Sequence, residues 1–490
     1  MKFLQRIKNE GFLGIAPGEL KITLVAFAYI FFVICSYYVL KPVRGSLGME
    51  LGKDNIPVIG LLSMIVIIAS NAVYSVLVGM YRRDIFIPMI TKFFVVCIFV
   101  FWSIFTFVFP ADIDKKGGEK PQKTIAEAES LSVENDERTL QPKADSVSEK
   151  AAIEQSIFRS NLPRALAISV YYLWVGVFAL LAVSMFWSFM NDVFSVGQSK
   201  RLYAIIGYGG LIGGAVGSMI TFYLVPLIGT ANLLLVAMVI LYPSIWSMKF
   251  IHQKHSEVKA EISPQPAPEA PVHPPRPWDG FWAVYRTPIL VFMAFEMFLL
   301  TFSSTLFYQQ LIEMINRVFS TDTDATTEFF AGYFGRITVL SLVSQFFLTR
   351  LVMMLPNPVV GLFIFPLIQV VATALMLLSP SLEIVSWGLI ISSAISYSTG
   401  RAIRELVYVP LDREQKYQGK GFIDTVVFRL GDGLSSIILI GGLELLSYGI
   451  WIDWTILLSM AAQFYVIIKI ARLFAESLKV GNDKVSQTVT

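Results

Sequence analysis

Runs of about twenty apolar residues recur from one end of the sequence to the other, and this is the length that a helix needs to cross a bilayer. Hydrophobic residues make up 55% of the 490 residues and charged residues only 15%, whereas a soluble domain carries about 25% charged residues. The runs are continuous rather than alternating, which excludes a transmembrane β-barrel. We therefore predict an all-α, multi-pass membrane protein.

We expect about twelve membrane spans, placed by length and hydropathy. Their residue ranges are 22–40, 57–79, 85–109, 165–189, 203–224, 231–248, 288–312, 330–351, 359–378, 384–395, 426–446 and 451–470. The tenth is the weakest, because its apolar run leads into the polar residues Ser396, Ser398 and Arg401.

A proline-rich segment at 249–285 divides the spans six and six, and its composition is typical of an extended linker. Two parallel halves of six spans are the plan of major-facilitator-like transporters, which bind substrate between the halves near the bilayer midplane. A twelve-span channel or a scaffold is the alternative. The predicted domains are a cytoplasmic N-terminus with an interfacial helix (1–21), an N-terminal half (22–248) that includes an extracytoplasmic loop (111–163), a cytoplasmic linker (249–285), a C-terminal half (286–472) and a cytoplasmic tail (473–490).

Lysine and arginine are distributed unequally among the connections. The basic ones are the N-terminus, 81–83, 198–201, 249–286, the connection at Arg350, 401–420 and the C-terminal tail. The connections 226–230, 379–383 and 447–450 carry almost no basic residue. Because basic loops are retained in the cytoplasm, we expect both termini to be cytoplasmic. The long loop 111–163 is charged and poor in aromatics, so we expect it to be weakly ordered.

Two cations close the first apolar run. Lys41 and Arg44 are three residues apart and share a helical face, and Pro42 between them frees a backbone carbonyl. Charge within a span is costly and normally faces a cavity, a partner or an aqueous interface. The alternative is that both side chains snorkel to the headgroups at the end of the span.

Further charges occur in the C-terminal spans. Glu296 lies inside a very apolar run and is a candidate for carrying a coupling proton or for pairing with Arg336. Arg429 and Asp432 are three residues apart and can pair on one helical face. The densest group of charges near the membrane combines this pair with Arg401, Arg404, Glu405, Lys420 and Asp424. It predicts a salt-bridge network that gates the cytoplasmic side, a substrate site, or both.

The remaining polar and small residues indicate no other chemistry. Gly210, Gly214 and Gly217 share one face of the fifth span, which favours close helix packing over a phosphate-binding loop. Cys35 and Cys97 lie in apolar runs, and the three histidines fall in one polar loop. No disulfide framework, metal-ligand spacing or nucleophile-base constellation is present, so we expect no metal and no cofactor, and an enzyme is the least favoured class.

Three segments resemble the ATP/ADP translocase family of plastids and intracellular bacteria, the non-mitochondrial nucleotide transporters also known as NTP/NDP exchange transporters. They are 38–44 (YVLKPVR), 186–210 with Phe186-Trp187, Asp192 and Lys200-Arg201, and 408–424 with Tyr408-Val409-Pro410-Leu411 and Lys420-Gly421-Phe422-Ile423-Asp424. The last is the most specific. The sequence differs from the family at Gly45, at Tyr172 and near Leu306 and Phe307, where nucleotide-exchanging members carry an acid.

The resemblance implies exchange of ATP for ADP across a membrane, sometimes with protons, at basic residues that correspond to Arg44, Lys41 and Lys420. It also implies a bacterial inner membrane. Fixed cations in a low-dielectric cavity suit a polyphosphate. We therefore expect Lys41, Arg44, Arg336, Arg404, Lys420 and Arg429 to attract phosphates, and Tyr37, Tyr38, Tyr172 or Trp187 to stack on a base.

Two other functions stay open. One is proton-coupled transport of another small, anionic solute, with Glu296 or Glu405 as the proton carrier and with Arg401, Asp424 and Asp432 in coupling or gating. The other is a non-transporting scaffold that uses the loops 111–163 and 249–285. The expected partners are a small-molecule substrate and the lipid bilayer. No feature indicates a nucleic acid, and the oligomeric state is not predicted.

Overall fold

The computed structural model describes residues 19–80, 83–109, 162–194, 196–261, 279–319, 322–412, 415–446 and 449–489. Within these ranges every regular element is helical. The predicted interfacial helix before residue 19, most of the loop 111–163 and the centre of the proline-rich segment lie outside the described residues.

The N-terminal helices are α2 (Leu20–Glu50), α3 (Ile56–Met80), α4 (Arg83–Ser103), α7 (Leu162–Val193), α8 (Val196–Ile228) and α9 (Leu233–Glu261). The C-terminal ones are α10 (Asp279–Arg286), α11 (Pro288–Phe319), α12 (Thr323–Phe346), α13 (Leu348–Met353), α14 (Ile364–Leu378), α15 (Leu382–Ile395), α16 (Arg401–Val407), α17 (Lys420–Phe422), α18 (Phe428–Leu446) and α19 (Trp451–Val489). Short 3₁₀- and π-helical turns join several of them, among them η2 (Lys53–Asn55), η6 (Ser396–Gly400), η7 (Gln415–Gly419) and η8 (Ile423–Val427).

Eleven helical stretches of the described chain are long and apolar enough to cross a membrane. The predicted tenth span accounts for the difference from twelve. Its helix α15 has only 14 residues, but the chain stays helical through the π turn η6 and through α16 to Val407. The all-α, multi-pass fold is thus confirmed, and the π turn η6 interrupts the weakest predicted span before it reaches the length of a membrane crossing.

The first span is longer than predicted. Helix α2 continues through Pro42 to Glu50 instead of ending near Leu40. Pro42 lacks an amide hydrogen, so the carbonyl four residues earlier, that of Tyr38, has no helical partner there. As a result, Lys41 and Arg44 lie inside the helix, several residues before its end, and not at its boundary.

Helices α2 and α8 pack backbone against backbone. A Cβ added at Gly209, Gly213 or Gly217 would come within 2.3–2.5 Å of an α2 carbonyl oxygen, so only glycine fits at these three positions. The predicted packing role is confirmed, but the stripe is Gly209-Gly213-Gly217. Gly210 and Gly214 instead face side chains, at ordinary or slightly tight distances.

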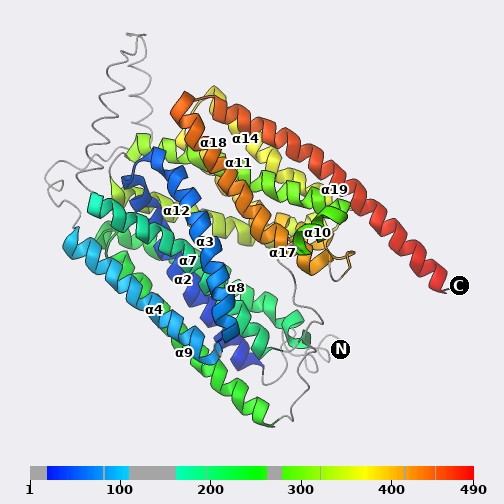
Figure 1. Cartoon of the computed structure of the whole chain (residues 1–490), viewed down its shortest axis with the longest axis horizontal. Coiled ribbons are helices and arrows are strands. Elements are labelled where there is room, and N and C mark those ends of the chain that lie inside the picture. Colours follow the sequence, from blue (N-terminus) through cyan, green and yellow to red (C-terminus); the bar gives the residue numbers. More distant parts are fainter. Residues whose placement is uncertain are drawn as a thin grey trace.

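The apolar cores follow the two halves of the sequence. One cluster of buried residues joins α2, α4, α7, α8 and α9, and two others lie mostly among α11 to α19. Figure 1 shows α2, α4, α8 and α9 on one side of the bundle and α11, α14, α18 and α19 on the other. The halves meet where α8 and α2 pack on α12, and where α3 packs on α18.

Polar contacts join the halves at one end, which we call the far end; it carries the connections 51–55 and 229–232, the end of α11 at Phe319 and the start of α12 at Thr323. Lys53 Nζ pairs with Glu313 Oε2 at 2.8 Å, and Gln309 donates to the Lys53 carbonyl. Thr327 Oγ1 donates to Ser46 Oγ at 2.5 Å, and the Thr230 hydroxyl lies 2.8 Å from that of Thr327.

The opposite end, where α2 begins and α19 extends past the bundle (Figure 1), we call the near end. Two ion pairs between described residues here each lie within one half: Arg201 with Glu19 in the N-terminal half, and Lys420 with Glu405 in the C-terminal half. In this structure the halves are therefore tied together by ion pairing at the far end.

Candidate functional site

A cavity of about 550 Å³ lies between the two halves. This is within the range of pockets that hold small molecules. Five helices supply its lining, namely α2 with Tyr37 and Arg44, α3 with Gly60, Ser63, Met64 and Ile67, α7 with Gly176, Ala179, Leu180, Val183 and Ser184, α11 with Thr305, and α18 with Arg429, Asp432 and Ser436. The lining from α3 and α7 is largely apolar apart from Ser63 and Ser184, while the charged groups come from α2 and α18.

Arg44 is the cation on the N-terminal wall. Its guanidinium lies over the Tyr172 ring, with Cζ 3.8 Å from the ring centre. Its Nε is buried and has no hydrogen-bond partner, and no ion pair to Arg44 is found in the described part of the chain. A buried cation without a counter-charge is costly, so this arrangement favours an anionic ligand. The ring of Tyr172 is thus the surface that the Arg44 guanidinium contacts.

Lys41 lies one turn before Arg44 but does not line this cavity. Its ammonium is 3.8 Å from the centre of the Phe334 ring of α12, and the rings of Tyr38 and Tyr37 are 5.3 and 5.9 Å away. Among the described residues it has no acidic partner. Cation–π contacts therefore take the place of a salt bridge at the junction of α2 with the C-terminal half.

Arg429 and Asp432 form the charged part of the C-terminal wall. Arg429 Nη1 is 3.4 Å from Asp432 Oδ2, which confirms the predicted pair but makes it a long, single contact. Thr305 of α11 donates to the other carboxylate oxygen at 3.1 Å. Both charged side chains are about 30% exposed (30% and 31%), so both are accessible from the cavity.

Tyr397 is a residue that sequence reasoning missed. It lies in the π turn η6, its side chain is 61% exposed, and it is within electrostatic range of Tyr37, Tyr38 and Asp432. A side chain that is exposed and yet close to residues of both halves faces the space between them. The only signal in the sequence was a tyrosine within the weakest span, and π turns frequently occur at functional sites.

Glu296 and Arg404 lie together inside the C-terminal half. Glu296 is 2% exposed, and its Oε1 is 3.4 Å from Arg404 Nη1. Arg404 also donates to the Ser396 carbonyl in η6. The predicted alternative that Glu296 pairs with Arg336 is therefore wrong. Neither Glu296 nor Arg404 lines the central cavity.

Part of the predicted charge cluster is present at the near end, whereas its Arg429–Asp432 pair lines the central cavity instead. Lys420 Nζ is 2.6 Å from Glu405 Oε1 and lies over the Tyr408 ring. Asp424 is within electrostatic range of Lys420, Glu405, Arg404 and Arg401. This group lies away from the cavity, since none of its members is among the lining residues.

Three other predicted site residues lie elsewhere. Arg336 is exposed on α12 and is stacked near Trp387 of α15, and it shares a face with the exposed Val339 and Val343. Trp187 packs against Phe186 and Tyr203 in the N-terminal core. Tyr38 lies at the α2–α8–α12 junction, beside Gly214.

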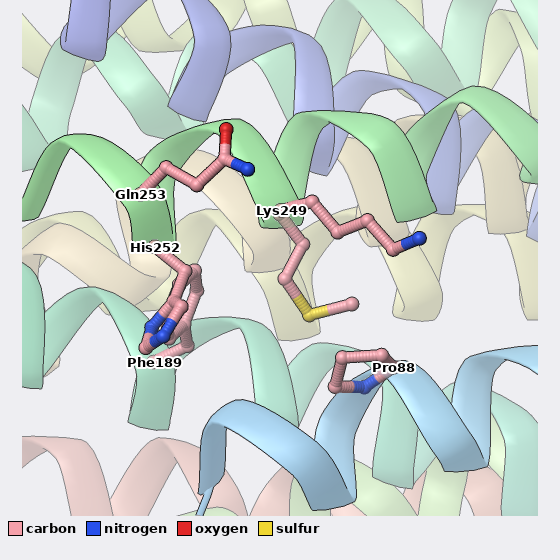
Figure 2. A pocket seen from close by; sticks show the side chains of 6 residues that line it. Pro88, Phe189, Lys249, His252 and Gln253 are labelled. Atoms are coloured by element: carbon pink, nitrogen blue, oxygen red, sulfur yellow. The ribbon is translucent and has the colours of Figure 1, made fainter. Parts of the chain in front are cut away.

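A second, smaller pocket of about 120 Å³ lies at the near end between α4, α7 and α9. Figure 2 shows His252 beside Phe189 at one side of it and Pro88 at the other. His252 belongs to helix α9 and not to a loop as predicted, because that helix continues to Glu261. The pocket is enclosed by one half alone, which distinguishes it from the cavity between the halves.

Comparisons with known proteins bear on the family and on the fold. The sequence model of the TLC ATP/ADP transporter family matches residues 342–474, which include α15, η6, α18 and the 408–424 motif. The family resemblance is thus confirmed over that segment. The chain is a membrane transporter. A crystal structure of a D-xylose-proton symporter is similar to it in fold, with a TM-score of 0.54 and 12% identity.

That similarity covers 91% of the transporter and 97% of the symporter chain, and it confirms the major-facilitator-like fold. A comparison with curated proteins gives no match. The family match lies almost entirely in the C-terminal half, so Arg429 and Asp432 fall within the matched segment and Arg44 falls outside it.

Proposed function

We propose that the transporter carries a nucleotide or another phosphorylated anion between the halves by alternating access, with exchange of ATP for ADP as the first candidate. The observation that carries this proposal is Arg44, a half-buried cation at the wall of the central cavity with a partnerless Nε and no acid beside it among the described residues. Phosphate oxygens would supply the missing acceptors, since guanidinium binds them bidentately.

Arg429 on the opposite wall would hold a second phosphate oxygen, so that the anion bridges the halves. Tyr37 and Tyr172 offer aromatic faces close to Arg44 for a base. With the near end assigned to the cytoplasm from the loop charges, the polar contacts between the halves lie at the opposite, outer end, and the cluster of Lys420, Glu405 and Asp424 would attract the substrate and gate its entry.

Glu296 and Glu405 are the two acids considered as proton carriers for proton-coupled transport. Each forms an ion pair with a basic residue outside the cavity. Glu296 pairs with Arg404, and Glu405 pairs with Lys420. The proton-coupled alternative therefore finds no support at either residue. A scaffold gives no reason for an uncompensated arginine at a cavity wall.

The test of function is uptake of labelled ATP into proteoliposomes preloaded with ADP, compared with empty ones. We expect uptake that depends on internal ADP. Uptake that is equal in both would exclude obligatory exchange. No uptake of any nucleotide or phosphorylated sugar in either would overturn the proposal.

The test of the site is a matched pair of arginine variants. Arg44→Gln removes the cation at the cavity wall and should weaken ATP binding roughly ten- to a hundredfold, the usual effect of losing hydrogen bonds to a charged group. Arg336→Gln removes an arginine from the outer face of α12 and should leave binding within about twofold. Equal effects of the two variants would contradict the assignment of the site.

A further inference from the structure

We propose that Asp432 is the proton acceptor of the transport site, and that the bound anion displaces it from Arg429, so that one proton is bound together with one anion. This inference rests on the proposed function, because it needs an anion at the central cavity. The surroundings of Asp432 set it apart from Glu296, Glu405 and Asp424.

Asp432 is the only carboxylate among the residues that line the central cavity in the described part of the chain. Glu296 is buried against Arg404, and Glu405 and Asp424 belong to the near-end cluster. An anion held by Arg44 and Arg429 would lie next to the Asp432 carboxylate, since Arg429 contacts that carboxylate along the same helix and both line the cavity.

The geometry of the Arg429–Asp432 contact allows another anion to replace the carboxylate at the guanidinium. Its contact is single and 3.4 Å long, whereas an optimal charge-assisted pair is about 2.7–2.9 Å and often bidentate. A phosphate oxygen can therefore replace the carboxylate at the guanidinium. The displaced Asp432 keeps the Thr305 hydroxyl, which is able to donate to a carboxylate or accept from a protonated carboxyl.

The charges around Asp432 determine its protonation once the anion is bound. Arg429 faces it from its own helix, Tyr397 faces it from η6, and Arg44 and Tyr37 line the same cavity from α2. The lining residues of α3 and α7 include no titratable side chain. When the anion has taken both arginines, an ionised Asp432 is left beside a like charge, and this favours its neutral form.

The proton comes from water in the cavity and adds to a carboxylate oxygen of Asp432 when the anion binds. It returns to water when the anion leaves and Arg429 recovers its partner. No bond other than this O–H bond is made or broken at the carboxylate, and each anion that binds is accompanied by one proton, which is released again with it.

The experiment measures ATP affinity as a function of pH on the purified, full-length protein, together with proton uptake on binding in weakly buffered solution with an indicator dye. It is made above pH 7, where the terminal phosphate, with a pKa of about 6, is ionised. For the wild type we expect ATP binding to take up protons, and the affinity for ATP to fall as the pH rises. One linked proton limits this fall to tenfold for each pH unit. Asp432→Asn should bind without proton uptake and with little pH dependence.

Three further variants keep the result interpretable. Asp432→Ser serves as a second neutral variant if Asp432→Asn is not monodisperse, and Asp432→Glu should retain the pH dependence because it retains the carboxyl. Glu383→Gln, which changes an exposed acid at the start of α15, should behave as the wild type.

The outcomes separate the two proposals. ATP binding with the same pH dependence and proton uptake in the wild type and in a folded neutral variant overturns the role of Asp432 and leaves the proposed function intact. Absence of binding for every phosphorylated anion at every pH overturns the proposed function, and this inference with it.

Discussion

Residues of α2 next to the central cavity also pack against the C-terminal half. Gly45 follows Arg44, and a Cβ added there would lie 2.9 Å from the ring of Phe330 of α12. The acid that family members carry at this point does not fit in this chain, because Phe330 is fully buried. The difference at Gly45 thus accompanies a bulky ring on the facing helix.

Gly45→Ala should lower stability by about 1–3 kcal/mol, the usual cost of overpacking a core. The double variant Gly45→Ala/Phe330→Leu should lose less than the sum of the single changes, because the smaller side chain makes room for the methyl group. Thermal unfolding of the purified variants checks both statements. Strict additivity would mean that the two side chains do not meet.

At the scale of elements, the close contact of α2 with α8 depends on three glycines that face carbonyl oxygens. Gly213→Ala should cost at least about 1–3 kcal/mol, since the methyl group would push against the α2 backbone at Phe31 and no side chain there is able to yield.

Gly207→Ala is the matched control in the same helix. No heavy atom lies within 4 Å of a Cβ at that position, so the change should stabilise α8 by about 0.5–1 kcal/mol through the lower flexibility of alanine. Unfolding midpoints that move in opposite directions for the two variants are the expected result. A similar loss in both would show that the register of α2 on α8 differs from the one described.

The sequence was sufficient to predict the elements but not the partners of their charges. Span positions follow from apolar length, which the bilayer sets locally. The partner of Glu296 depends on how distant helices pack, and Arg404 lies 108 residues away while Arg336 lies only 40 away on the next helix. The continuation of α2 through Pro42 was missed because proline only weakens a helix that its neighbours hold in place.

At the scale of the whole molecule, the polar contacts at the far end hold the halves together. A cycle that opens this end must break the Lys53–Glu313 pair and the hydrogen bond between Thr327 and Ser46. Ser46→Cys with Thr327→Cys, in a background without Cys35 and Cys97, should therefore lose transport on oxidative cross-linking and regain it on reduction.

Each single cysteine variant under the same oxidant is the control, and both should retain transport. Full transport by a completely cross-linked double variant would show that the far end does not separate during the cycle. The measurement is uptake into proteoliposomes before and after treatment with a reducing agent.

The glycine contacts between α2 and α8 have a mechanical consequence. Backbones that touch without intervening side chains have no room to slide, so α2 and α8 move as one rigid body. Arg44 therefore travels with the N-terminal half and Arg429 with the C-terminal half. Rocking of the halves changes the separation of the two guanidinium groups while each keeps its own local surroundings. An anion bound to both guanidinium groups would therefore oppose any movement of the halves that increases the distance between Arg44 and Arg429.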